Sequence, residues 1–84
     1  MTQGKANSAD PKTMGGRLQK ARVEMGMTQR QLAVASGIEW RTIGHIEASR
    51  ALGRWTSIVA LARALDVSLY YIVGERDGYG SFGE

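Results

Sequence analysis

The chain has 84 residues, enough for one small domain, and its 11 Lys and Arg residues against 8 Asp and Glu residues give a formal net charge of +3. It contains no cysteine and one histidine, which excludes a disulfide scaffold, a thiolate metal site and a His-rich metal site. No apolar run approaches the roughly 20 residues of a membrane span, and the N-terminus lacks the apolar stretch of a signal peptide. We therefore expect a soluble cytoplasmic protein without a membrane partner.

Basic side chains are concentrated in the first two thirds of the chain. Residues 1–54 carry nine basic and four acidic side chains, whereas residues 55–84 carry two basic and four acidic ones. This asymmetry favours a polyanionic partner for the front part of the chain.

Both ends of the chain have too few apolar residues to bury a core. Residues 1–13 are mostly small or polar, and residues 75–84 include three glycines. Segments of this composition do not offset the entropy cost of ordering, so we expect a flexible N-terminal arm over 1–13 and a Gly-rich tail over 75–84. Residues 14–74 remain as the folded domain.

Apolar residues recur at helical spacing from the start of this domain. A first helix is predicted over 14–25, ended by Gly26, from the repeat of Met14, Leu18, Ala21 and Met25. Thr28 and Gln31 have the spacing of a capping box, which predicts that a second helix begins at this point. It is predicted to run to about residue 36, before Gly37.

Three further helices are predicted in the second half of the domain. The third runs from near Glu39 to about Ser49, the fourth over about 56–65, and a short fifth opens at Ser68 and ends at Gly74. The inner face of the fourth is formed by Ile58, Leu61, Ala62 and Leu65. No segment shows the alternation of a strand, so the predicted fold is all-α with five short helices.

The second and third helices are joined by a turn of about three residues, the spacing of a helix-turn-helix motif. At 100° per residue, the third helix has an inner face of Ile43, Ile46 and Glu47, with Glu39 at its edge, and an outer face of Trp40, Arg41, Gly44, His45 and Ala48. A helical glycine costs about 1 kcal/mol relative to alanine. Either Gly44 is a tolerated weak point, or the small Gly44/Ala48 strip admits another surface such as the floor of a DNA major groove.

Several stretches spread over residues 14–74 resemble the phage repressor/Cro-like (XRE-type) helix-turn-helix family. They are RLQKAR (17–22), GMTQ (26–29), LA (32–33), SGI (36–38), Ile43, IE (46–47) and ARALDVS (62–68). The resemblance implies a five-helix, lambda-repressor-like domain with the third helix as recognition helix and no cofactor. It also implies a homodimer on double-stranded DNA, with pseudo-palindromic half-sites about 34 Å apart.

The resemblance assigns base-reading positions to the third helix. Arg41 matches a position suited to a bidentate contact with guanine, its alternative being a solvated charge. His45 matches a later reading position, with contact to a base or a phosphate; its alternative is to be merely exposed or capped by a neighbour. Trp40 meets a thymine methyl or a sugar edge, or folds back over the second helix. Glu39 departs from the family, since relatives favour Ser or Thr as N-cap there; its carboxylate is expected to accept a hydrogen bond from cytosine N4 or only to cap the helix. Gly44, singled out above from the helix face, would allow the close approach.

Phosphate contacts are expected at the start of the second helix and around the third. Gln29 matches a position whose backbone N–H and side chain meet phosphate, and a helix N-terminus favours an anion. Arg30 contacts phosphate or only solvent. The full set of expected phosphate contacts is Thr28, Gln29, Arg30, Thr42, Arg50 and Arg54. Ala48-Ser49 replaces the family's Asn-Gly after the third helix, which puts a backbone contact there in doubt.

Other matched positions are structural. Arg22 and Glu47 match an ion pair between the first and third helices. Trp55 stands where relatives have a core aliphatic residue, so it is assigned to the core. Tyr70, Tyr71 and Ile72 fit a core contact together with a modest dimer face.

These features predict a sequence-specific DNA-binding regulator, most simply a repressor that competes with polymerase. A restriction-modification controller, a phage switch protein and an antitoxin-type autoregulator are alternatives on the same fold. A protein-interaction module without DNA is an alternative of another class. An enzyme is not expected, because the sequence has no carboxylate pair, nucleophile–base pair or phosphate loop.

Overall fold

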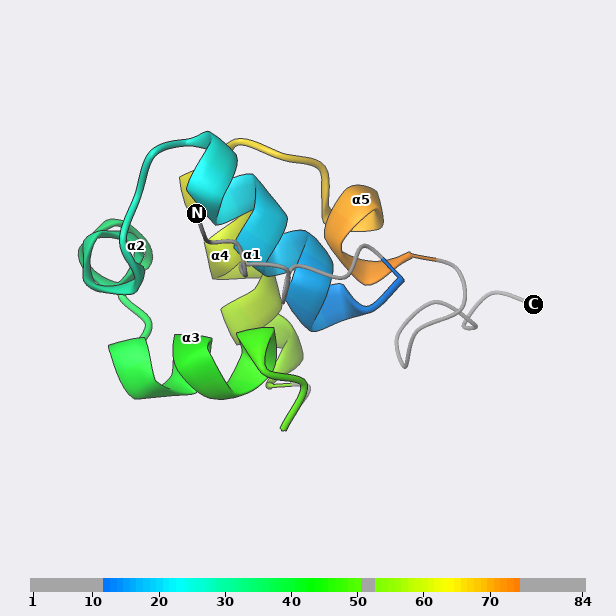
Figure 1. Cartoon of the computed structure of the whole chain (residues 1–84), viewed down its shortest axis with the longest axis horizontal. Coiled ribbons are helices and arrows are strands. Elements are labelled where there is room, and N and C mark those ends of the chain that lie inside the picture. The colour runs from blue at the N-terminus through cyan, green and yellow to red at the C-terminus, as the bar shows by residue number, and fades with distance from the viewer. Residues whose placement is uncertain (1–11, 51–52, 75–84) are drawn as a thin grey trace, which may run out of the picture.

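The computed structural model describes residues 12–50 and 53–74, and over these residues the chain is helical without strands. The helices are α1 (Met14–Glu24), α2 (Gln29–Ser36), α3 (Trp40–Glu47), α4 (Trp55–Leu65) and α5 (Leu69–Val73). The all-α, five-helix prediction is confirmed (Figure 1). Most of the predicted arm (1–13) and the whole predicted tail (75–84) lie outside the described residues. No described helix has both the length and the apolar character that a membrane crossing requires.

Polar side chains fix the starts of three helices. At α2 the predicted capping box is present: the Gln31 N–H donates to Thr28 Oγ1 at 3.0 Å, and the Thr28 N–H donates to Gln31 Oε1 at 2.8 Å. The hydroxyl of Thr13 accepts from the Gly16 N–H at the start of α1. The hydroxyl of Ser68 accepts from the Tyr71 N–H at the start of α5. Each cap satisfies an amide that the helix leaves without a partner, and so stabilises the helix start.

The end of α3 lies two residues earlier than the sequence pattern predicted, at Glu47 rather than Ser49. Ser49 has a φ of 62°, in the left-handed region, and the Arg50 N–H donates to the His45 carbonyl at 2.8 Å. This bond to the carbonyl five positions earlier in the chain is the Schellman closure of a helix. Ser49 therefore takes the left-handed position, next to Ala48, that a glycine fills with less strain.

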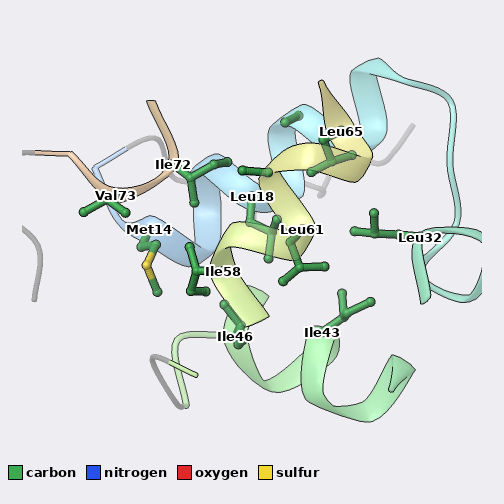
Figure 2. Packing of buried hydrophobic residues seen from close by; sticks show 12 residues of the cluster. Met14, Leu18, Leu32, Ile43, Ile46, Ile58, Leu61, Leu65, Ile72 and Val73 are labelled. Carbon is green, nitrogen blue, oxygen red and sulfur yellow. The ribbon is translucent and has the colours of Figure 1, made fainter. Parts of the chain in front are cut away.

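The core lies between the helices, and each of the five described helices contributes apolar side chains to it. Figure 2 shows Ile43 and Ile46 pointing from α3 toward Ile58 and Leu61 of α4. The core residues are Met14, Leu18, Ala21, Leu32, Ile43, Ile46, Ile58, Leu61, Ala62, Leu65, Ile72 and Val73. The predicted inner face of the fourth helix is thereby confirmed. Because α3 turns its two isoleucines inward, its opposite side is left facing outward.

The assignment of Trp55 to the core was wrong. Trp55 is the first residue of α4 and its side chain is 39% exposed. It lies one turn before Ile58 on the same face of the helix, but at the end of α4, where the core thins out. The assignment rested on the core aliphatic residue that relatives carry at this position, and that resemblance did not indicate where along the face of α4 burial ends.

Two contacts to α1 position α3 and α5. A Cβ added at Gly15 would lie 2.8 Å from the Glu47 carbonyl oxygen, so the backbones of α1 and α3 touch at this point. The Arg17 guanidinium donates to the carbonyls of Ile72 and Val73, at 3.0 and 2.9 Å, and so satisfies the C-terminal end of α5. The α1 helix therefore holds both neighbours in place.

Candidate nucleic-acid interface

The outer face of α3 is presented to solvent as predicted. Ile43, Ile46 and Glu47 are buried, whereas Arg41, His45 and Ala48 are exposed and Trp40 is 36% exposed. In Figure 1, α3 lies along one edge of the molecule, with the other helices on one side of it. Side chains on the outer face can therefore meet a large partner without any rearrangement of the core.

The first turn of α2 lies beside this outer face. The Arg30 guanidinium carbon is 4.4 Å from the centre of the Trp40 ring. A Cβ added at Gly44 would lie 3.7 Å from Gln29 Oε1. Side chains from the start of α2 and from the outward side of α3 thus form one continuous surface, which we call the α2–α3 face: Gln29, Arg30, Trp40, Arg41, Gly44 and His45.

A polar network under this surface ties α1, α2 and α3 together. Arg22 and Glu47 form a bidentate ion pair, with Nε–Oε2 at 2.7 Å and Nη2–Oε1 at 3.0 Å. The same guanidinium donates to the Met27 carbonyl at 2.8 Å. Glu47 is only 6% exposed, so its charge is compensated almost entirely by protein groups. The ion pair has a structural position, beneath the outward surface.

Gln29 joins the network from the α2 side. Its Nε2 donates to Glu47 Oε1 at 3.1 Å, which fixes the side chain between the buried pair and Gly44. Within the described chain, no residue accepts from the backbone N–H groups of Gln29 and Arg30, which open α2. Free amides at a helix N-terminus carry partial positive charge and favour an anion.

Trp40 packs toward the second helix, which was one of the two alternatives for it. Arg30 of α2 lies over its ring at 4.4 Å, and Arg41 lies 5.5 Å from the ring centre. Glu39 is the N-cap residue of α3 but makes no side-chain capping hydrogen bond, so the capping alternative for it is not realised. Its exposed carboxylate stands at the start of the helix.

The remaining expected contacts differ in exposure. Thr28 uses its hydroxyl oxygen to accept from Gln31, and Thr42 is half-buried. Arg50 and Arg54 are both exposed, Arg50 just past the end of α3 and Arg54 as the N-cap residue of α4. The α3 helix is about 12 Å long. Trp40 is its first residue, and Arg50 lies just beyond its other end.

The comparison with protein families agrees with this geometry. A family model described as a helix-turn-helix domain matches residues 13–69. The chain belongs to the helix-turn-helix domain family. Neither the comparison with curated proteins nor that with solved structures found a match. Membership makes DNA the expected partner, and α2, the turn at 37–39 and α3 form the motif.

Two contacts of the helix-turn-helix domain were missed by the sequence reasoning. The Arg30–Trp40 stack joins side chains ten positions apart on different helices, and the Gln29–Glu47 bond spans 18 positions. The only signal in the sequence for the Arg30–Trp40 contact was the outward placement of Trp40. A large apolar indole on an outer face is expected to pack against a neighbouring side chain. A helical period assigns each residue to a face of its own helix and does not identify the side chain opposite.

Gly44→Ala separates the two explanations for the helical glycine. A Cβ at this position makes only ordinary contact with Gln29, so we expect the variant to be more stable by up to about 1 kcal/mol. If α3 lies against a duplex, the added methyl group should weaken DNA binding in the same variant. Urea unfolding and duplex titration check the two effects separately. Unchanged DNA affinity would identify Gly44 as a tolerated weak point.

Proposed function

We propose that this helix-turn-helix domain is a sequence-specific transcription regulator of the phage repressor/Cro-like (XRE-type) class. It acts most simply as a repressor that competes with polymerase, and it binds a pseudo-palindromic operator with α3 in the major groove. The observation that carries the proposal is the α2–α3 face, where Arg41 and His45 of α3 are exposed beside the free amides of α2. A cationic, outward helix next to a helix N-terminus suits a groove bordered by phosphates.

Within this proposal the residues divide into base-reading and phosphate-contacting groups. Arg41 reads guanine through two parallel hydrogen bonds, His45 contacts a base or phosphate further along, and Glu39 accepts from cytosine. Phosphates are held by the α2 amides and by hydroxyls and guanidiniums that fix the orientation without reading sequence. The proposed phosphate contacts are Thr28, Gln29, Arg30, Thr42, Arg50 and Arg54.

The proposed regulator is a homodimer with two α3 helices about 34 Å apart. The supporting observation is on α5. Tyr70 is 68% exposed and Tyr71 is also exposed, whereas Ile72 of the same helix is buried in the core. Two exposed tyrosines on one short helix offer amphipathic contact area for a second copy. Sedimentation of the protein with and without an operator duplex tests the stoichiometry.

Titration of a labelled random duplex at two salt concentrations tests the function. We expect weak binding whose affinity falls steeply as salt rises, because each neutralised phosphate releases counterions. Lack of binding, or binding that salt does not affect, would favour a protein-interaction module on the same scaffold. Selection of bound sequences from a random duplex pool then gives the half-site and the spacing.

Arg41→Ala and Arg50→Ala should weaken binding in different ways. Loss of Arg41 should relax the preference at one base pair by about 1–3 kcal/mol, because a bidentate contact with guanine is lost. Loss of Arg50 should weaken binding to all sequences alike and reduce the salt dependence. Both variants are compared on the selected operator and on single-base variants of it. A uniform loss in both would show that the division of roles is wrong.

A further inference from the structure

Two arginines share one indole ring on the α2–α3 face. The Arg30 guanidinium carbon lies 4.4 Å from the centre of the Trp40 ring, and that of Arg41 lies 5.5 Å from it. Arg30 is the second residue of α2, and Trp40 is the first residue of α3. Both distances are within the range at which the negative face of an aromatic ring attracts a cation. The ring therefore links the N-terminal turns of both helices of the motif.

The two guanidiniums keep their hydrogen-bonding capacity in this arrangement. All five N–H donors of a guanidinium lie in its plane, so a guanidinium that stacks flat on a ring can still donate to a partner beside the ring. Neither Arg30 nor Arg41 forms an ion pair with a carboxylate in the part of the chain that is described. Two oriented, uncompensated cations on an exposed surface favour an anionic partner.

The Trp40 residue is exposed, but part of its ring surface is occupied by an arginine. Its side chain is 36% exposed, and Arg30 lies over its ring. A ring face covered by a guanidinium cannot also stack on a base or lie flat on a sugar. The indole is better placed to restrict the two long arginine side chains, whose rotamer freedom would otherwise be lost on binding.

We propose that Trp40 is a positioning residue, which holds Arg30 toward the phosphate backbone and Arg41 toward the base edges before DNA arrives. This inference rests on the proposed function, and it replaces direct base contact by Trp40 with an indirect effect. Arg30 thereby becomes a preorganised phosphate contact and Arg41 a preorganised base contact. Removing the ring should impair both arginines at once. The effect on Arg41 should appear as lost base-pair discrimination, and the effect on Arg30 as a weaker salt dependence of binding.

The stack can be tested in the free protein, without DNA. In a Trp55→Phe background, Trp40 is the single fluorescent indole of the chain. Arg30→Ala should shift its emission and increase its quenching by neutral acrylamide, because the covering guanidinium is gone. Arg63→Ala removes an exposed arginine from α4 and serves as the matched control, with no change expected. Unchanged emission and quenching in Arg30→Ala would overturn the proposal.

Duplex binding then tests the positioning role. Trp40→Leu should lose roughly tenfold or more of the discrimination at the base pair that Arg41 reads, and should reduce the salt dependence that Arg30 provides. Trp40→Phe keeps a ring and should retain most of both. In an Arg41→Ala background, Trp40→Leu should relax that base pair no further. Circular dichroism checks that each variant is folded.

Other outcomes contradict the inference in distinct ways. If Trp40→Leu changes the preference at a base pair of its own and leaves that of Arg41 intact, Trp40 reads DNA directly. If binding by Trp40→Leu equals that of the parent, the ring positions nothing. If the parent protein shows no salt-dependent duplex binding, the proposed function fails together with this inference, whereas the fluorescence result for the free protein still reports the stack.

Discussion

Glu47→Ala should lower the free energy of unfolding by about 3–5 kcal/mol, because it leaves the partly buried Arg22 guanidinium without its carboxylate. The pair is bidentate, and Glu47 also accepts from Gln29 of α2, so one substitution loosens the contacts of α3 with two helices. A domain of about 60 residues has roughly 3–5 kcal/mol of stability in total. Urea unfolding followed by circular dichroism should therefore show a largely unfolded variant.

Two controls identify the cause. The double variant Arg22→Met/Glu47→Leu removes both charges and should recover most of the stability, because an apolar pair needs no compensation. Glu24→Ala breaks the exposed pair with Lys20, whose N–O distance is 2.6 Å, and should have no measurable effect. If the double variant is as unstable as Glu47→Ala, the lost stability comes from packing rather than from an uncompensated charge.

The exposed pair also has a defined pH dependence. The hydrogen bond from Lys20 to Glu24, and next the negative charge of Glu24, raise the pKa of Lys20 above its ordinary value. A raised lysine pKa gives a contribution that is fully present at neutral pH and is lost only as the pH rises through the folded-state pKa. The effects of Glu24→Ala and Glu47→Ala on the free energy of unfolding should therefore be compared at neutral pH, where Lys20 is fully charged.

Gly15→Ala should destabilise the domain by about 3 kcal/mol or more, as expected when a group is forced into a packed contact. Its Cβ would meet the carbonyl oxygens of Ile46 and Glu47, which belong to the backbone of α3 and cannot rotate away. The only relief is separation of α1 from α3, which would also stretch the Arg22–Glu47 pair. Thermal unfolding should show a large fall in the midpoint.

Gly44→Ala is the matched control for this substitution. Both glycines lie within helices, and both variants gain the higher helix propensity of alanine. They differ in surroundings, since the nearest atom to an added Cβ at Gly44 is a side-chain oxygen of Gln29 at 3.7 Å. Equal stability of the two variants would mean that α1 and α3 do not approach as closely as the structure indicates.

The local sequence determined where most helices begin and which side of each is buried. The capping box of Thr28 and Gln31 acts within one turn, so it was recognisable from residue type and spacing alone. The inward position of Ile43 and Ile46 follows from the helical period, since residues three apart share a face. The same helical period also identified the outer face of α3, with Trp40, Arg41 and His45, as the candidate recognition surface.

The sequence was less informative where a helix or its burial ends. Trp55 shares a face with Ile58 but lies at the edge of the core, and α3 ends before Ser49 because that residue adopts a left-handed conformation. Helical periodicity shows which face of a helix is buried, but it does not show how far along the helix the buried part of that face extends. A serine at a left-handed position also gives no signal of the kind that glycine gives.

Helix starts, buried faces and the outward side of α3 were thus fixed by interactions among residues a few positions apart. The partners across helices were decided only by tertiary packing: Arg30 over Trp40, Gln29 on Glu47, and Gly15 against the end of α3. Spacing along the chain sets the direction of a side chain on its own helix. Which side chain it meets depends on the crossing of two helices, and that crossing is set by how the whole core fills space.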